Sequence, residues 1–146
     1  MTAKRCKDCD PTSKRPTPHP GPRCTTHHRA FIKASKTAAH GRRVTTTYGI
    51  GPEAYTAILG AQNGRCYICQ RATGAAKRLA VDHDHACCPA GGSCGKCVRS
   101  LLCQPCNRGV LGHLRDDIEA LKRAIAVIRD RPAQAVLNAL DTKDHE

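Results

Sequence analysis

A chain of 146 residues with a net charge of +12 is long enough for one domain, or for a small domain with an appendage. Leu, Ile, Val and Phe together supply only 23 residues and Trp is absent, which excludes a large apolar core. The 11 Cys are the obvious replacement for such a core. The first residues carry no apolar stretch and no later run reaches membrane-spanning length, so we expect a cytoplasmic protein without membrane contact. Because paired Cys in a reducing compartment usually bind metal, the sequence predicts zinc rather than disulfides.

The positive charge is concentrated in the first third of the chain. Residues 1–47 hold 11 Lys or Arg against two Asp, whereas residues 48–146 hold 13 against 10 acidic residues. This basic arm indicates a polyanion as partner, most simply DNA, and a solubilising tail is the alternative. An acidic membrane surface fits less well, because the arm lacks an amphipathic apolar face.

Within the arm, a proline-rich stretch at residues 10–23 predicts an extended loop between two pairs of metal ligands. Cys6 and Cys9 precede this loop, and Cys24 and His27 follow it. The spacing predicts a small zinc knuckle, with His28 as a rival fourth ligand. Residues 29–47 are interpreted as a linker.

The ordered domain is expected to begin near Tyr48. Pro52 suits the first turn of a helix, whose apolar face would end before Asn63 and Gly64. The stretch "RCYICQ" at 65–70 is compatible with a short strand and a turn, and "RLAVDHDH" at 78–85 predicts a second strand. "LLCQPCNRGVLG" at 101–112 predicts a turn that opens a helix.

Two helices are expected at the C-terminal end. Ile118, Leu121, Ile125 and Ile128 form one apolar stripe of a helix running from about residue 116 to 131. Pro132 interrupts it, and apolar residues from 133 to 140 continue as a shorter helix. Both are interpreted as packing elements.

The strongest single motif is a pair of Cys-x2-Cys turns 33 residues apart. Such turns deliver four thiolates to one tetrahedral Zn²⁺ and leave no open position, which makes the site structural. The ligands are Cys66, Cys69, Cys103 and Cys106. The loop between 86 and 97 adds Cys87, Cys88, Cys94 and Cys97, a further zinc site if neighbouring Cys87 and Cys88 can share one ion. Two or three zinc ions per chain are therefore expected.

A second group of ligands is chemically harder. Asp82, His83, Asp84 and His85 end the predicted second strand, and Asn107 directly follows the last Cys of the central motif. A carboxylate and an amide oxygen can hold Mg²⁺, and an imidazole beside a phosphate can accept a proton from water. Further zinc ligands or ordinary polar surface are the alternatives.

The stretch from Tyr48 to about residue 131 resembles the recombination endonuclease VII family, mostly phage enzymes within the HNH (ββα-metal) nucleases. The matching residues are Gln62 and Gly64 before the first Cys pair, then "VDHDH", "VRSLLCQPCN" and "LGHLRDD". The resemblance implies that Asp82 and Asn107 bind a catalytic Mg²⁺ or Mn²⁺, that His83 is the general base and that His85 assists at the phosphate.

These observations predict a small α+β protein held together by zinc, with a ββα-metal (HNH) nuclease core, flanking helices and an N-terminal zinc-knuckle arm. Its expected parts are the arm and linker at 1–47, the nuclease domain at 48–131, and a helix and tail at 132–146. By resemblance it hydrolyses phosphodiester bonds in branched or distorted DNA. A non-catalytic zinc-stabilised DNA-binding module and an HNH homing nuclease are the alternatives, and the short chain after Gly112 leaves a homodimer open.

Overall fold

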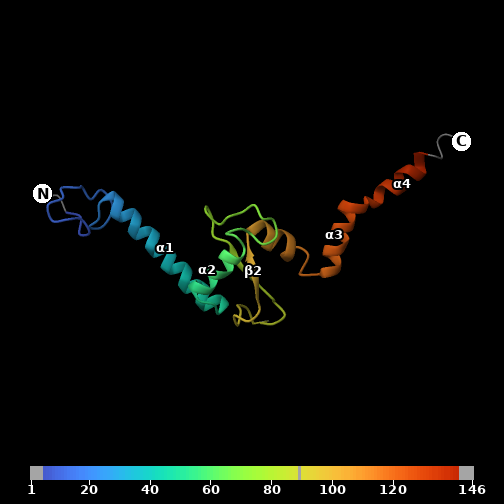
Figure 1. Ribbon diagram of the computed structural model, residues 1–146, viewed down its shortest axis with the longest axis horizontal. Coiled ribbons are helices and arrows are strands. Elements are labelled where there is room, and N and C mark those ends of the chain that lie inside the picture. The colour runs from blue at the N-terminus through green and yellow to red at the C-terminus, as the bar shows by residue number, and fades with distance from the viewer. Residues whose placement is uncertain (1–4, 89, 142–146) are drawn as a thin grey trace. The chain divides into compact units, whose positions relative to one another are not determined.

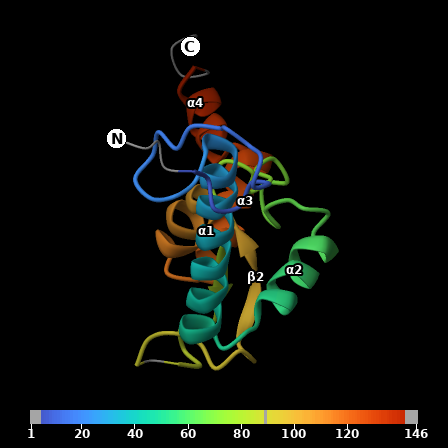
Figure 2. The same ribbon diagram turned by 90° about the vertical axis from the view of Figure 1, so that its left-hand side faces the viewer.

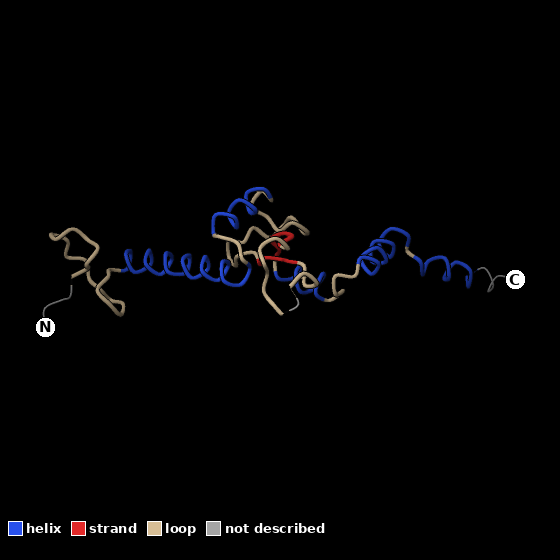
Figure 3. Tube along the Cα trace, turned by 90° about the horizontal axis from the view of Figure 1, so that it is seen from below, coloured by secondary structure: helices blue, strands red, loops and turns tan. Residues whose placement is uncertain are grey.

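A computed structural model describes residues 5–88 and 90–141. Over these residues the chain forms five helices and a two-stranded sheet, which confirms a small α+β protein (Figure 1). Strand is confined to two short segments, and the long loops between elements are those that precede and follow the first of them (Figure 3). The elements in chain order are α1 (Thr25–Tyr48), α2 (Pro52–Ala61), β1 (Ala80–His83), β2 (Val98–Leu102), the π-helix η1 (Pro105–Gly112), α3 (Ile118–Asp130) and α4 (Pro132–Asp141).

The chain divides into two compact units. The first runs to Ala61 and includes residues 83–99, and the second includes residues 62–82 and continues from Ser100. The expected borders after residues 47 and 131 remain predictions, and residues 1–4 of the arm and 142–146 of the tail lie outside the described residues. None of the helices in the described part of the chain combines the length and the hydropathy needed to cross a membrane.

The first unit contains a helix that the sequence pattern does not reveal. Residues 29–47, for which composition indicates only a linker, form most of α1, a single continuous helix (Figure 2). It begins after Cys24 and ends at Gly49, whose φ of 66° allows its N–H to donate to the carbonyl of Thr45. Because α1 buries only Val44, it has no apolar stripe that could have predicted it.

The helix α2 forms where the sequence predicts it. Pro52 is its first residue, where its missing N–H costs nothing, and Tyr55 is buried. The His40 ring of α1 packs edge-on against Tyr55, with 4.7 Å between ring centroids. Asn63 and Gly64 follow α2 with φ values of 53° and 70°, which ends the helix as expected.

The two-stranded sheet pairs β1 with β2, and one of its strands was expected elsewhere. β1 confirms the strand predicted within residues 78–85; at 65–70 the predicted turn forms, but the short strand expected with it does not. That segment is a turn, in which the Cys66 N–H donates to the Ala72 carbonyl and the Tyr67 N–H to the Leu101 carbonyl. The partner strand is instead 98–102, which buries Leu101 and Leu102.

The remaining elements belong to the second unit. η1 confirms the helix predicted at the second Cys pair. Asp117 caps the start of α3, because its carboxylate accepts from the N–H groups of Glu119 and Ala120. Arg131, with a φ of 46°, separates α3 from α4. The interpretation of α3 and α4 as packing elements is wrong within the described chain, because their apolar stripe faces solvent and Ile128 is 82% exposed.

Candidate metal centres and active site

The two predicted Cys-x2-Cys turns meet in the second unit. We call Cys66, Cys69, Cys103 and Cys106 the central cluster, and their sulfur atoms all lie within 4.8 Å of one another. Cys69 Sγ and Cys103 Sγ are 3.8 Å apart, close to the edge of about 3.8 Å that a tetrahedron with Zn–S bonds of about 2.3 Å would have. The cluster can therefore hold zinc.

The surroundings of the central cluster shift the pKa values of its thiols in opposite directions. Backbone N–H groups of Ala72 and Arg71 lower the pKa of Cys69 to about 6, whereas burial and the neighbouring thiol of Cys103 raise the pKa of Cys106 to about 12. Four thiolates cannot share this space without positive charge, because they repel one another. A bound Zn²⁺ would supply that charge and deprotonate the remaining thiols.

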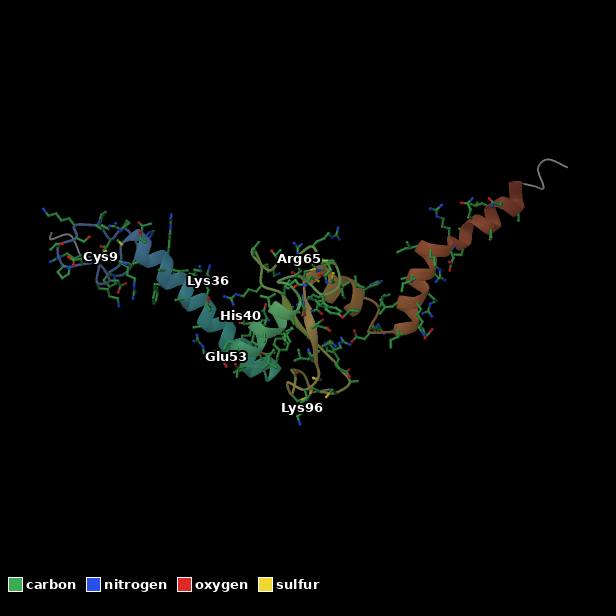
Figure 4. All side chains as sticks on the ribbon, in the orientation of Figure 1. Cys9, Lys36, His40, Glu53, Arg65 and Lys96 are labelled. Atoms are coloured by element: carbon green, nitrogen blue, oxygen red, sulfur yellow. The ribbon has the colours of Figure 1, made fainter. Side chains whose placement is uncertain are left out.

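The first unit carries the predicted knuckle, which we call the N-terminal cluster: Cys6, Cys9, Cys24 and His27. His27 Nδ1 lies 3.3 Å from the sulfur atoms of Cys6 and Cys9. His28 is not in the cluster, and its ring stacks on His19 at 4.3 Å. The structure therefore favours His27 over His28 as the fourth ligand. Cys9 marks the cluster in Figure 4.

The position of His27 among thiols has an electrostatic consequence. The pKa of His27 is raised, mainly by its hydrogen bond with Cys6. Burial raises the pKa of Cys6, but hydrogen bonds from the backbone N–H groups of Cys24 and Asp8, together with those from the His27 and Cys9 side chains, lower it to about 6. A metal ion bound between His27 Nδ1 and these sulfur atoms would displace any proton shared between them.

A third group lies in the loop between the strands, which we call the loop cluster: Cys87, Cys88, Cys94 and Cys97. Sulfur–sulfur distances are 3.9 Å for Cys87 to Cys94 and 4.0 Å for Cys88 to Cys97. Both neighbouring cysteines thus reach one site. Lys96 lies in the same loop (Figure 4).

The three clusters together account for every cysteine. All 11 Cys are free thiols, and with His27 they make three sets of four ligands. Sulfur atoms near 3.8 Å apart are about twice as distant as in a disulfide, whose S–S bond is about 2.05 Å. Zinc coordination is the arrangement that these distances fit.

The harder ligands occupy the end of β1. Asp82 is 3% exposed, and His83 directly after it is half-buried. The His83 ring contacts two other rings, at 5.6 Å from Tyr48 and 4.6 Å from His85. Asp82, His83, Asp84 and His85 belong to none of the three clusters in the described chain.

Asn107 is placed by the central cluster. It follows Cys106 in the first part of η1, and its N–H donates to the carbonyl of Cys103 at 2.9 Å. Asn107 and Asp82 belong to the second unit, while the paired rings of His83 and His85 belong to the first.

Two residues, Tyr48 and Gln62, support the candidate site in ways that the sequence did not reveal. Tyr48, the last residue of α1, packs edge-on against His83. Gln62 is buried, and its Nε2 donates to the carbonyls of Arg65 and Leu101 while its Oε1 accepts from the Leu101 N–H. Gln62 thereby ties β2 to the turn that carries the first Cys pair. The family resemblance marks Gln62 as a matching residue but does not reveal these hydrogen bonds.

Comparison with known proteins places these residues in a family. The family model of recombination endonuclease VII matches residues 41–130. A "Gene 59 protein" of Mycobacterium phage D29 is 48% identical over 137 residues, which cover 92% of this chain and 78% of the relative. Its counterpart from Mycobacterium phage L5 is 46% identical over 92% of this chain and 79% of the relative. No solved structure matches. The chain belongs to the recombination endonuclease VII family, which implies a nuclease.

Proposed function

We propose that the protein is a metal-dependent endonuclease of the HNH type that hydrolyses phosphodiester bonds in branched DNA. The family supports a nuclease acting on such DNA. The order of β1, β2 and η1 along the chain is compatible with the two strands and helix of a ββα-metal core.

The observation that carries the proposal is the burial of Asp82 next to a half-exposed histidine. A buried carboxylate is costly unless hydrogen bonds or a cation compensate for its lost hydration. His83 follows it on the same strand and keeps part of its ring accessible. A sheltered carboxyl group beside an accessible imidazole suits metal-assisted hydrolysis of a phosphodiester.

Asp82 and Asn107 are the residues that would hold the catalytic divalent ion. Their carboxylate and amide oxygens are hard ligands of the kind that Mg²⁺ and Mn²⁺ prefer, unlike the thiols of the three clusters. When bound, such an ion would offset charge on the scissile phosphate.

His83 is assigned the role of general base, because a histidine at the phosphate can take the proton of the attacking water. Its ring contacts with Tyr48 and His85 limit the orientations that it can adopt. His85 is exposed and would contact the phosphate.

The three clusters are assigned structural zinc, since each offers four ligands and leaves no open position for substrate. A non-catalytic DNA-binding module would explain the charge and the clusters equally well. It gives no reason for a buried Asp82 beside His83. A homodimer remains a prediction, which the mass of the protein in solution tests.

The test is cleavage of a four-way junction, a mismatched duplex and a plain duplex, each with and without Mg²⁺. We expect Mg²⁺-dependent cuts in the junction and few in the plain duplex. Asp82→Asn should abolish cleavage, and the matched control Asp84→Asn, two residues away and exposed, should cut like the wild type. Absence of cleavage of every DNA with Mg²⁺ or Mn²⁺ would favour the binding module.

A further inference from the structure

The middle of α1 buries none of its side chains. Every residue from 29 to 39 is exposed, although the Arg23 guanidinium lies over the Phe31 ring at 4.1 Å, and the His40 ring packs against Tyr55 of α2 (Figure 4). Most helices in proteins owe their stability to a buried apolar face, which this section lacks. An exposed helix section of this kind can present its side chains to a ligand instead of filling a core.

The side chains that it presents are cationic. α1 contains five Lys or Arg and no Asp or Glu. Arg29, Lys33 and Lys36 stand at i, i+4 and i+7, which places them on one face over a length of about 10 Å. We call these three residues the α1 stripe. Arg42 lies on the opposite side of the helix.

Both ends of α1 are fastened by metal-capable clusters. Cys24 precedes the helix and His27 lies in its first turn, so the N-terminal cluster is built onto its start. At the other end, Ser93 of the loop that carries the loop cluster donates its N–H to the Thr47 carbonyl at 2.9 Å. In the same loop, a Cβ on Gly95 would lie 2.7 Å from the Gly49 carbonyl oxygen. α1 is therefore held at its two ends rather than along a buried face.

The last residue of α1 contacts the candidate general base. Tyr48 contacts the His83 ring within the same unit. A polyanion lying along α1 would therefore be held on the same helix that contacts His83. Phosphates of one DNA strand lie about 3.4 Å apart along the duplex axis, so about three of them fall within the length of the α1 stripe.

We propose that the α1 stripe binds the phosphate backbone of a duplex arm of the DNA substrate. This inference rests on the proposed function for the identity of the polyanion. The contacts would be independent of base sequence, because Lys and Arg on phosphates position a duplex without reading it. Such contacts suit an enzyme that selects DNA by shape.

The test compares two triple variants that lose the same charge. One is Arg29→Gln/Lys33→Gln/Lys36→Gln. The control is Arg42→Gln/Lys122→Gln/Arg129→Gln, in which Arg42 lies off the stripe and Lys122 and Arg129 are exposed on α3. Glutamine keeps a helix propensity close to that of Lys and Arg, so circular dichroism and zinc content should match the wild type.

Affinity for an intact four-way junction is measured without Mg²⁺ at several salt concentrations. Losing three phosphate contacts should lower the slope of log K against log salt by about 0.9 per contact. Between roughly 50 and 200 mM salt, the wild type should then lose about 40-fold more affinity than the stripe variant does. The control should keep the wild-type slope, and the single variant Lys36→Gln should lose about 0.9.

Equal slopes for the stripe variant and the wild type would overturn the inference, as would an unchanged slope in Lys36→Gln. Equal losses on duplex and single-stranded DNA would overturn the assignment of a duplex arm. Failure of the proposed function looks different, because the wild type would then bind with the predicted slope but never cut. The cleavage rate at saturating junction should be the same in the stripe variant and the wild type.

Discussion

Replacing Gln62 by methionine tests how the central cluster and β2 are joined. Methionine has nearly the shape of glutamine but cannot make its three hydrogen bonds to Arg65 and Leu101. The Leu101 N–H would stay buried without an acceptor, at a cost of about 1–3 kcal/mol. The Leu101 carbonyl keeps the Tyr67 N–H as a donor, so the two carbonyl bonds together cost about another 1–2 kcal/mol. We expect a loss of about 2–5 kcal/mol.

The assay is urea unfolding at a fixed concentration of free zinc, with amide exchange of Leu101 as the local measurement. The matched control is Gln134→Met, because Gln134 is exposed and makes one side-chain bond, to Asn138. Its loss should stay within about 0.5 kcal/mol, as for most surface substitutions. If Gln62→Met is as stable as this control and Leu101 exchanges no faster, Gln62 does not tie β2 to the Cys66 turn.

The other predictions concern the clusters and α3. Protein purified without chelator should contain three zinc ions per chain by elemental analysis, and a content below two would contradict the ligand sets. Zinc removal should unfold the chain in circular dichroism, because few apolar side chains are buried. Backbone N–H groups of Ala120 and Glu119 lower the pKa of Asp117, so its capping contribution is complete above the ordinary pKa of about 4 and is lost as pH falls through the lowered value. Exchange of the Ala120 amide should be slow above pH about 4 and become faster as pH falls through the lowered pKa of Asp117. At neutral pH, Asp117→Ala should lose this slow exchange and Asp117→Asn should keep it.

Local chemistry made part of the fold predictable. Cys-x2-Cys turns, a proline at the start of α2 and an aspartate at the start of α3 each act within a few residues, so the sequence pattern reports them directly. α1 was not predicted, because most of it is exposed and it buries only Val44. β2 was missed because its few residues alternate poorly, and its position depends on Gln62, 39 residues earlier in the chain.

The candidate site shows the same limit. The prediction that Asp82, His83 and Asn107 serve a site separate from the thiols rests on residue chemistry alone, because thiols and hard oxygen ligands favour different metals. The contact of Tyr48 with His83 was not predicted, since it joins the end of an unrecognised helix to the end of a strand. The choice between His27 and His28 also needed the structure, because which ring faces the thiols depends on the first turn of α1.

The central claim, that His83 is the general base of a nuclease, is tested most directly by single-turnover cleavage of a four-way junction by His83→Ala in saturating Mg²⁺. The substitution removes no cluster ligand, so zinc content and junction affinity should match those of the wild type. Loss of a positioned base should slow cleavage by about 10²- to 10⁴-fold, and added Mg²⁺ should not restore it. His28→Ala, which removes a histidine that stacks on His19 and belongs to none of the three clusters, serves as the control and should cut at the wild-type rate. Cleavage by His83→Ala at the rate of this control would contradict the claim.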